Sequence, residues 1–383
     1  MKKIKAITVF GTRPEAVKMA PLVQEFKNHP QIESLVCVTA QHRQMLDQVL
    51  EIFKITPDFD LNIMQERQTL VGITTRALEG LSSVFEKVRP DIVLVHGDTT
   101  TTFVGSLAAF YNKISVGHVE AGLRTFDKYF PYPEEINRKL TGALADLHFA
   151  PTSISKENLL NEGVKRDKIY ITGNTAIDAL KTTVGKDYVF QNEVLQKIDY
   201  SGKRVIAVTA HRRENLGDPL KSICMSLKHI ADSYKDVEIV YPVHLNPAVQ
   251  EVAKSILGGH PQVHLINPPD AQEFACLMDK SYFIMTDSGG IQEEAPSLGK
   301  PVLVLRNETE RPEGVTAGTL KLAGTNEDKI IPLAVELLDN AQEYNRMSKA
   351  ANPYGDGRAS ERIAKALLYE FGLSKEKPEE FGL

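Results

Sequence analysis

Short apolar runs alternate with longer segments of helical periodicity from the start of the chain. The apolar runs are continuous, which is typical of parallel strands covered by helices on both faces. Strands that alternate with helices predict right-handed βαβ units. In the first half, strands are expected at residues 4–10 (IKAITVF), 34–38 (SLVCV), 91–98 (DIVLVHGD), 114–120 (ISVGHVE), 147–151 (LHFAP) and 168–173 (KIYITG).

The strand pattern pauses over residues 182–203 and then starts again. Between two of the later runs, apolar residues recur at i, i+3, i+4, i+7 and i+10, which predicts one buried helix face. These residues are Leu220, Ile223, Cys224, Leu227 and Ile230. The later strands are expected at residues 204–211, 237–244, 263–267, 282–289 and 301–306.

The pattern predicts an α/β protein with two Rossmann-like, doubly wound parallel-sheet domains. A chain of 383 residues is also long for one core. The first domain is expected over residues 1–172 and the second over 173–357. A final helix, at about 358–383, could pack on either domain, and packing back on the first is the alternative retained.

Composition limits the possible partners and the cellular compartment but does not indicate an activity. The net charge of −5 gives no general attraction to nucleic acid or to anionic lipid. The basic start, MKKIKAITVF, is followed by an apolar run too short for a signal peptide, and no run is long enough to cross a membrane. Three scattered cysteines, Cys37, Cys224 and Cys276, indicate a reducing compartment. We therefore expect a cytoplasmic protein.

Charged residues gather where the predicted strands end. Ligands of open parallel sheets bind outside the carboxyl ends of the strands. In the first half these ends read FGTRPE, HGDTTTT and GHVEAGLRT, so Gly11, Arg13, Asp98, Glu120 and Arg124 should share one rim. In the second half they read AHRRE, PVH, NPPD, TDSGG and RNETERPE. Two rims this rich in charge favour an enzyme.

The segment TDSGGIQEEAPSLGKPV, residues 286–302, is the most specific local pattern. Gly289 and Gly290 let backbone N–H groups approach an anion at a helix N-terminus. Glu294, about one turn later, suits the two hydroxyls of a ribose. The alternative is an ordinary tight turn whose acidic residues complement the helix dipole.

The remaining candidates are weaker. Arg13 and Lys18, near the start of the first helix, could face a pyrophosphate or simply be solvated. His211 and His244 end strands, but a lone histidine is more often only hydrogen-bonded in place. GxGxxG and P-loop sequences are absent, and no histidine pair has a zinc-type spacing, so no metal site is predicted.

Two glutamates differ in what their positions imply. Glu120 ends a buried strand, where desolvation should raise the pKa of an unpaired carboxyl group, and this favours a functional role. Glu134 follows Pro133 at a helix start, where an acidic residue ordinarily complements the dipole.

Together the motifs resemble the bacterial non-hydrolysing UDP-N-acetylglucosamine 2-epimerases. The resemblance runs from residue 3 to about 365 and implies a glycosyltransferase-B fold, with the active site in a cleft between two Rossmann-like domains. The segments that carry it are GTRPEAVKMAPL, TAQHRQMLDQVL, LVHGDTTTT, GHVEAGLRT, PEEINRKLTGALA, ITGNTAIDAL, HRREN, YPVHLNP, TDSGGIQEEAPSLGKPVLVLR, ERPE, AGT and NPYGDG.

The implied reaction interconverts UDP-N-acetylglucosamine and UDP-N-acetylmannosamine, for cell-surface polysaccharide synthesis. C2 of the sugar has no adjacent carbonyl group, so direct enolisation is not available. Elimination and re-addition of UDP, through a 2-acetamidoglucal, needs positioned carboxylates and held phosphates. It needs no metal or redox cofactor, and none is expected.

The resemblance also assigns residues. Asp98, Glu120 and Glu134 match the catalytic acids, and His211 is grouped with them. The UDP-phosphate contacts match Arg13, His211, Ser288, Gly289 and Gly290, the ribose contact matches Glu294, and Lys18 and Arg311 match further charged groups. A regulatory UDP-N-acetylglucosamine site matches Gln41, Gln44, Arg67, Glu134, Arg212 and His244.

Three alternatives stay open at this level. A hydrolysing epimerase would release N-acetylmannosamine and UDP, a glycosyltransferase would use the same fold with an acceptor, and a UDP-sugar sensor would be catalytically silent. The expected ligands are UDP-N-acetylglucosamine and UDP, with no nucleic acid or membrane partner. A homodimer is expected from the family alone.

Overall fold

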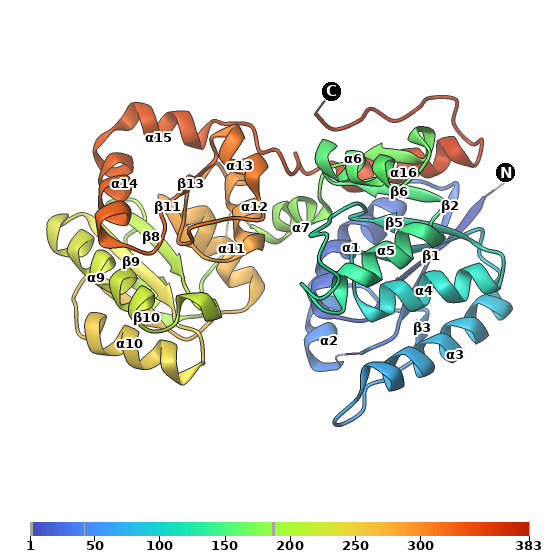
Figure 1. The fold of residues 1–383 in the computed structure, drawn as a ribbon, viewed down its shortest axis with the longest axis horizontal. Helices are drawn as coiled ribbons and strands as arrows, with labels where there is room; N and C mark the ends of the chain where they lie inside the picture. Colours follow the sequence, from blue (N-terminus) through green and yellow to red (C-terminus); the bar gives the residue numbers. More distant parts are fainter. Residues whose placement is uncertain (1–2, 42, 186–187, 383) are drawn as a thin grey trace. The chain divides into compact units, whose positions relative to one another are not determined.

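The chain forms two compact units, each built on its own parallel sheet. The computed structural model describes residues 3–41, 43–185 and 188–382. The first unit contains Met1–Ala179 and Tyr354–Leu383, and the second contains Leu180–Pro353 (Figure 1). The sequence analysis had placed these limits at 172 and 357. Of the predicted link at 182–203, residues 186 and 187 lie outside the described part.

The first unit has a wholly parallel sheet of seven strands within the described residues, in the order β3-β2-β1-β4-β5-β6-β7. In β1, Ile7 pairs in register with Leu35 on one side and with Val93 on the other. The strands are β1 (Ile4–Phe10), β2 (Ile32–Val38), β3 (Phe59–Asp60), β4 (Ile92–His96), β5 (Ser115–Val119), β6 (Leu147–Ala150) and β7 (Ile169–Ile171).

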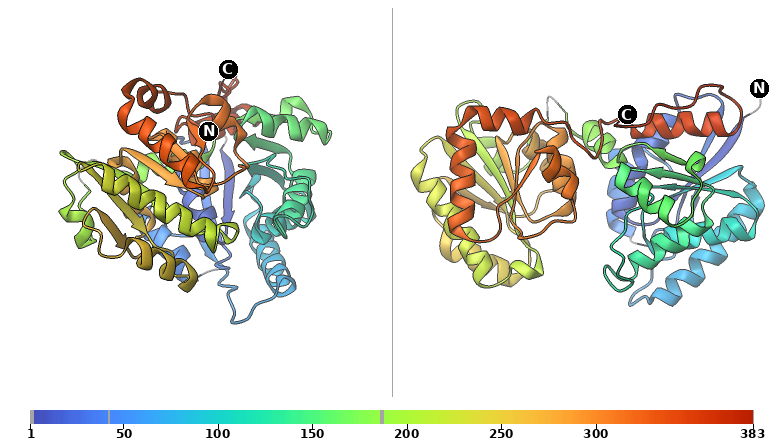
Figure 2. Two further views of the ribbon diagram at one scale, coloured as in Figure 1. Left: turned by 60° about the vertical axis from the view of Figure 1, so that its left-hand side comes forward. Right: turned by 45° about the horizontal axis from the view of Figure 1, so that its top comes forward.

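Helices cover both faces of this sheet (Figures 1 and 2). One face packs against α1 (Arg13–Phe26), α2 (Arg43–Ile52) and α16 (Ala359–Glu370), and the other against α3 (Leu70–Val88) and α4 (Thr100–Tyr111). The remaining helical elements are α5 (Glu134–Leu144), α6 (Ser153–Asn161), a 3₁₀ turn (Arg166–Lys168) and α7 (Thr175–Thr183).

The second unit repeats the arrangement with six parallel strands among the described residues, in the order β10-β9-β8-β11-β12-β13. Its strands are β8 (Arg204–Thr209), β9 (Val237–Pro242), β10 (Val263–Ile266), β11 (Phe283–Thr286), β12 (Val302–Val304) and β13 (Leu320–Leu322). Its helical elements are α8 (Glu193–Lys197), a 3₁₀ turn (Arg213–Asn215), α9 (Asp218–Ser233), α10 (Pro247–Leu257), α11 (Ala271–Lys280), α12 (Gly289–Ser297), α13 (Pro312–Ala317), α14 (Glu327–Asp339) and α15 (Ala341–Ser348).

The two cores of the second unit follow from its apolar periodicities. The predicted face of α9 is buried throughout and packs with α10 and α14 on one side of the sheet. Residues of α11 and α12 pack on the other side. The strands between the two cores are apolar on both faces, as the continuous runs predicted.

The strand orders confirm the predicted fold class and locate the ligand-binding edge of each unit. In both sheets the order reverses beside the first strand of the unit, between β1 and β4 and between β8 and β11. Ligands of doubly wound sheets bind outside the carboxyl ends of the strands at such a reversal. The sequence analysis missed β3 and β13, which are edge strands of two and three residues.

The last helix, α16, belongs to the first unit. The buried carboxylate of Asp178 on α7 accepts hydrogen bonds from the N–H groups of Ala359 (3.2 Å) and Ser360 (2.8 Å) and so caps its N-terminus. Ile363 and Leu367 then face the core beneath α1. Tertiary contacts thus bring the end of the chain back to the first sheet.

The search for a membrane-crossing helix, made over the described residues, found none of sufficient length and apolar character. Cys37, Cys224 and Cys276 are buried free thiols. Burial raises the pKa of Cys37 and of Cys224 to about 12, so both stay protonated at neutral pH.

Two glycines with positive φ allow a test of how tightly the segment after β5 is packed. Gly122 has a φ of 91°, and a Cβ there would lie 2.2 Å from the backbone oxygen of Ser155. Gly163 has a φ of 87°, but a Cβ would meet nothing within 4 Å. We expect G163A to cost roughly 1 kcal/mol, from the backbone conformation alone. G122A should cost at least ~2 kcal/mol, because strain and a backbone clash add. Denaturant unfolding measures both, and equal losses would contradict this packing.

Candidate active site

Glu120 follows the carboxyl end of β5 and carries a buried carboxylate at the first unit's ligand-binding edge. Its φ of 61° turns the chain out of the strand, a conformation that non-glycine residues rarely adopt. Its side chain is 8% exposed. Oε1 accepts hydrogen bonds from Lys18 Nζ (2.5 Å) and Asn174 Nδ2 (3.0 Å), and Oε2 lies 3.6 Å from His96 Nε2.

These partners reverse the expected effect of burial on Glu120. Burial alone would raise the pKa of its carboxyl group, but the Lys18 ammonium, the nearby His96 and the Asn174 amide lower it further than burial raises it. The prediction of a raised pKa was wrong, because it treated the carboxylate as unpaired. Burial also lowers the pKa of His96 to about 4, so this imidazole is neutral at pH 7. The site therefore holds an ionised carboxylate, an ammonium group and a neutral imidazole.

The turn between β1 and α1 is occupied by the protein's own carboxylate. Glu15 is buried, and its Oε2 accepts hydrogen bonds from the N–H groups of Gly11 (3.1 Å) and Thr12 (2.8 Å). Oε2 also accepts from the hydroxyl group of Thr12 (2.8 Å), and Oε1 accepts from the hydroxyl group of Thr99 (2.7 Å). Burial raises the pKa of Glu15 despite these donors. The two N–H groups that a pyrophosphate could use are therefore already bonded.

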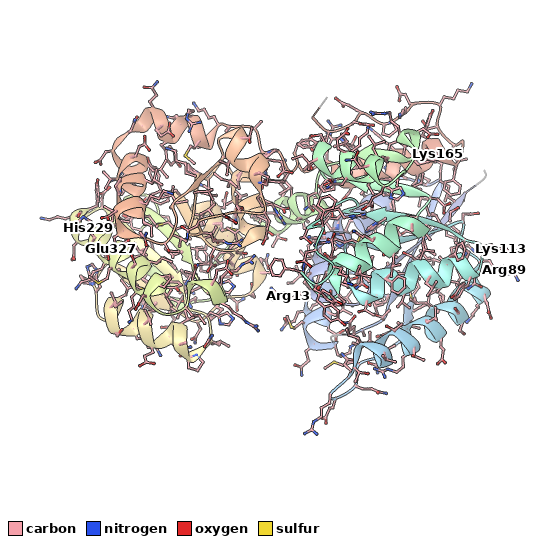
Figure 3. All side chains as sticks on the ribbon, viewed as in Figure 1. Arg13, Arg89, Lys113, Lys165, His229 and Glu327 are labelled. Atoms are coloured by element: carbon pink, nitrogen blue, oxygen red, sulfur yellow. The ribbon has the colours of Figure 1, made fainter. Side chains whose placement is uncertain are left out.

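Arg13 and Lys18 diverge from this turn. Lys18, on the second turn of α1, reaches Glu120. Arg13 lies at the surface of its unit (Figure 3) and forms no hydrogen bond or ion pair with the described residues. A role for Arg13 toward a phosphate stays a prediction.

Asp98, after β4, is held by the first turn of α5. Its Oδ2 accepts hydrogen bonds from Arg138 Nε (2.9 Å) and Nη2 (2.7 Å), and its backbone oxygen accepts one from Asn137 Nδ2 (2.9 Å). The Asp98 side chain is 25% exposed, so it remains open to solvent on one side. This pairing fixes α5 relative to the end of β4.

Of the two adjacent acids that start α5, it is Glu135 that holds the preceding loop. Glu135 is fully buried and accepts hydrogen bonds from the N–H groups of Thr125 (3.1 Å) and Phe126 (3.0 Å) and from Arg138 Nη1 (3.2 Å). Glu134 is half-buried, and its carboxylate has no hydrogen-bond or ion-pair partner in the described chain. Glu134 is thus the acid of this pair that is left for a ligand.

The loop between Glu120 and Glu134 exposes its aromatic rings and turns its arginine inward. Arg124, expected on the rim, instead makes a two-point ion pair with Glu162, with Nε–Oε1 of 2.8 Å and Nη2–Oε2 of 2.7 Å. Four rings are more than 60% exposed, at Phe126, Tyr129, Phe130 and Tyr132.

In the second unit, Asp287 joins the ends of β8 and β11. Its fully buried Oδ2 accepts hydrogen bonds from the N–H groups of His211 and Arg212, both at 2.7 Å, and from Asn215 Nδ2 at 3.0 Å. Oδ1 lies 3.5 Å from His211 Nδ1. Because Asp287 binds the loop after β8, the N-terminus of α12 is left for another partner.

Two guanidinium groups lie over that N-terminus. A Cβ at Gly289 would lie 3.8 Å from Arg212 Nη2 and 3.9 Å from both Arg311 Nη2 and Glu310 Oε2. Arg311 Nε also donates to Glu293, and Glu310 lies 3.9 Å from Arg212 Nη1. A helix N-terminus with two guanidinium groups favours an anion with several oxygens, such as a phosphate. The Glu294 carboxylate lies 3.7 Å from where a Cβ of Gly290 would be.

The two histidines predicted in this unit lie together. The rings of His211 and His244 stack with centroids 5.1 Å apart and planes 3° apart. His244 Nδ1 accepts a hydrogen bond from the N–H of Asn246 (3.0 Å), which leaves the proton of the neutral ring on Nε2. Of the predicted regulatory residues, Arg212 and His244 belong to this unit, while Gln41, Gln44, Arg67 and Glu134 belong to the first. The regulatory site stays a prediction.

Several residues of these sites were missed from the sequence. Glu15 had a signal, because Thr12-x-x-Glu15 has the spacing of a capping box. His96, Asn174, Glu135 and Arg138 had none, because their roles depend on partners distant in the sequence or, for Glu135, on the fold of the loop. Across residues 3–41, 43–185 and 188–382, no group of three or more His, Cys, Asp or Glu residues is arranged to hold a metal ion.

Comparison with known proteins gives one consistent result. A family model described as UDP-N-acetylglucosamine 2-epimerase matches residues 24–368. The UDP-N-acetylglucosamine 2-epimerase of Bacillus subtilis (strain 168) is 61% identical over 381 residues, which cover 100% of this chain and 99% of that protein. That of Escherichia coli (strain K12) is 56% identical over 372 residues, which cover 95% of this chain and 98% of that protein.

Solved structures agree with the sequence comparisons. A crystal structure of a UDP-N-acetylglucosamine 2-epimerase matches 100% of both chains, with a TM-score of 0.94 and 59% identity. The structure of the Neisseria meningitidis UDP-GlcNAc 2-epimerase bound to UDP-GlcNAc matches 95% of this chain and 100% of that one, with a TM-score of 0.83 and 52% identity.

The ion pair between Lys18 and Glu120 predicts a distinctive pH dependence of stability. In the wild type the lowered pKa of Glu120 means that the pair stabilises the fold at neutral pH and that this contribution is lost only in acid. In K18M the Glu120 carboxyl group has lost its counter-charge, so burial raises its pKa in the folded state. Ionising this group near neutral pH then lowers the free energy of unfolding. We expect a loss of ~2–3 kcal/mol at about pH 8 that shrinks toward about pH 5.

Thermal unfolding of wild type and K18M across this pH range measures the effect. The double variant K18M/E120Q serves as the control, because it removes the unpaired charge and should recover most of the loss. A loss in K18M that does not vary with pH would contradict the assignment.

Proposed function

The chain belongs to the UDP-N-acetylglucosamine 2-epimerase family and thus acts at C2 of UDP-N-acetylglucosamine, and we propose that it does so by elimination and re-addition of UDP. A base removes the C2 proton while the C1–O bond breaks, and the electron pair of that bond leaves with UDP. A double bond forms between C1 and C2, giving a 2-acetamidoglucal. UDP then adds back to C1, and a proton reaches C2 from the opposite face.

The observation that carries this mechanism is the buried, ionised Glu120. A C2 proton without an adjacent carbonyl group needs a positioned carboxylate in a site that excludes water. Glu120 is fixed by Lys18 and Asn174 on one oxygen, while its other oxygen faces only the neutral His96 at 3.6 Å. Because the Lys18 ammonium keeps the pKa of Glu120 low, the carboxylate is ionised at neutral pH, the form that can accept a proton.

Asp98 and Glu134 complete the set of carboxylates in this proposal. Glu134 has no partner within the described residues and is therefore free to exchange a proton on the second face of the sugar. Asp98 is anchored by Arg138 and is suited to hold a sugar hydroxyl or to share the proton. Clustered carboxylates titrate as a coupled group, so their pKa values in the reaction belong to the set.

The second unit binds UDP in this proposal. Its α12 N-terminus, with Ser288, Gly289 and Gly290, meets a phosphate, and Arg212 and Arg311 add positive charge. Charge grows on the phosphate as the C1–O bond breaks, so these groups stabilise the transition state more than the bound substrate. Support comes from the Neisseria meningitidis relative, whose structure is bound to UDP-GlcNAc. In this proposal His211 contacts a phosphate and Glu294 contacts the ribose.

The cytoplasmic location and the homodimer implied by the resemblance remain predictions. The same holds for activation by UDP-N-acetylglucosamine at a regulatory site. None of them is needed for the chemistry above.

Solvent deuterium distinguishes elimination from its alternatives. We expect enzyme incubated with UDP-N-acetylglucosamine in D₂O to place deuterium at C2 and to form the manno epimer. Proton NMR measures both. Both occur because the C2 proton leaves to a carboxylate that exchanges with solvent. Retained protium at C2 would exclude the mechanism. Accumulating N-acetylmannosamine would indicate hydrolysis, and no change would leave a sensor or an acceptor-dependent transferase.

Gly289 provides a separate test of the UDP site. A Cβ at this position meets only groups at 3.8–3.9 Å, so G289A should fold with an unchanged melting temperature. The added methyl group blocks a phosphate from the backbone N–H groups of α12. Losing a charge-assisted hydrogen bond of this kind should raise the Kd for UDP roughly 10- to 100-fold.

Calorimetric titration with UDP measures this Kd. The control is G163A, which changes a glycine of the other unit and should bind UDP as the wild type does. Equal UDP affinity in G289A and G163A would move the phosphate site elsewhere.

A further inference from the structure

Asn174 is a buried residue whose side chain and backbone bond in three directions. Its amide Nδ2 donates to Glu120 Oε1 at 3.0 Å, and its Oδ1 accepts from the N–H of Ala176 at 3.0 Å. Its backbone N–H donates to the oxygen of Tyr354 at 2.7 Å. It is 3% exposed. One residue thus contacts the candidate carboxylate, the first turn of α7 and the segment on which the chain returns to the first unit.

The hydrogen bond from Ala176 to Asn174 Oδ1 fixes the direction of the bond from Asn174 Nδ2 to Glu120. Because Oδ1 caps the start of α7, the amide plane of Asn174 cannot rotate without breaking the cap, and its Nδ2 must point at Glu120. Lys18, by contrast, reaches Glu120 on a flexible side chain that is about one-quarter exposed, at 26%. Lys18 supplies the charge that keeps Glu120 ionised, and Asn174 fixes the orientation of the Glu120 carboxylate.

Both donors bond to the same oxygen of Glu120 and leave the other one without them. Lys18 and Asn174 both bond to Oε1, whereas Oε2 has only the His96 ring at 3.6 Å. On the basis of the proposed function, we propose that Asn174 is a positioning residue that holds Glu120 by Oε1 and so makes Oε2 the atom that exchanges the C2 proton.

The chemistry of this position selects asparagine. An amide is the short side chain that can accept the N–H of a helix start and donate to a carboxylate at once. Aspartate keeps the cap but cannot donate, and it adds a second negative charge. Serine keeps the cap without charge but is too short to reach Glu120. These two replacements separate the capping role of Asn174 from its positioning role.

The place of α7 in the fold explains why the cap is rigid. Ala179, on α7, packs in the core of the first unit. Asp178 of the same helix caps α16. The first half of the helix that begins after Asn174 is therefore held to the first unit by packing and by hydrogen bonds.

The test compares N174D and N174S with D178N, which weakens the α16 cap from the same helix without touching Glu120. The charged or titratable groups that face Glu120 among the described residues are Lys18 and His96.

In N174D a new carboxylate joins them and raises the pKa of Glu120. The acidic limb of the kcat profile should then move to higher pH, and kcat should fall ~10²-fold, as expected for a misplaced reacting group. In N174S we expect a loss of about tenfold, with the KM for UDP-N-acetylglucosamine within a few-fold of the wild type.

D178N should lower the melting temperature but leave the pH profile of kcat unchanged. If N174D and N174S only lose stability, with the wild-type pH profile and kcat, Asn174 is a helix cap and the proposal is wrong. Should N174D fail to fold, the kcat of N174S decides. Deuterium incorporation at C2 by the wild type is measured in parallel. Its absence would refute the proposed function itself, whereas its presence with an unaffected N174S would refute only the positioning role.

Discussion

A buried carboxylate must be given hydrogen-bond donors, and this requirement organises both ligand-binding edges of the molecule. Taking an ionised group out of water costs several kcal/mol unless hydrogen bonds or a counter-charge replace the lost hydration. Glu15 takes two backbone N–H groups and two hydroxyl groups, and Glu120 takes an ammonium and an amide. Glu135 and Asp287 each take two backbone N–H groups and a side chain. Each carboxylate thereby fixes the loop that supplies its donors.

The same requirement separates the carboxylates that we propose to react from those that shape the site. Glu135 and Asp287 bond mainly to the backbone of neighbouring turns. Glu15 bonds to both backbone N–H groups and hydroxyl groups of its neighbours, so all three shape the site. Glu120 bonds to side chains from α1 and from the start of α7, and one of its oxygens has no close donor. Glu134 lies beside Glu135 but points to no donor in the described structure. The acids suited to chemistry are those whose bonding is incomplete.

Much of this organisation could be predicted from the residues. Continuous apolar runs predicted the parallel strands, and the strand ends predicted which residues gather at each edge. Glu120 was suspected for its place after a buried strand. The sign of its pKa shift could not be predicted, because Lys18 lies 102 positions away in the chain and the pairing depends on the fold. Asn174 and His96 were missed for the same reason, and Arg124 was placed on the rim although Glu162 draws it inward. The short edge strands β3 and β13 held too few residues to form a pattern.

The side chain of Glu15 makes the two units differ in whether their first strand-turn-helix can bind a phosphate. Both units have the same order of strands at the reversal, so both offer a strand-turn-helix of the kind that binds phosphate. In the first unit the buried side chain of Glu15 already occupies the N–H groups of that turn, whereas the corresponding helix start of the second unit has two guanidinium groups and the Glu310 carboxylate close by. Under the proposed function, the second unit is therefore the copy of this architecture that binds a phosphate. In that proposal one fold holds the leaving group and the other carries the acids that handle the proton.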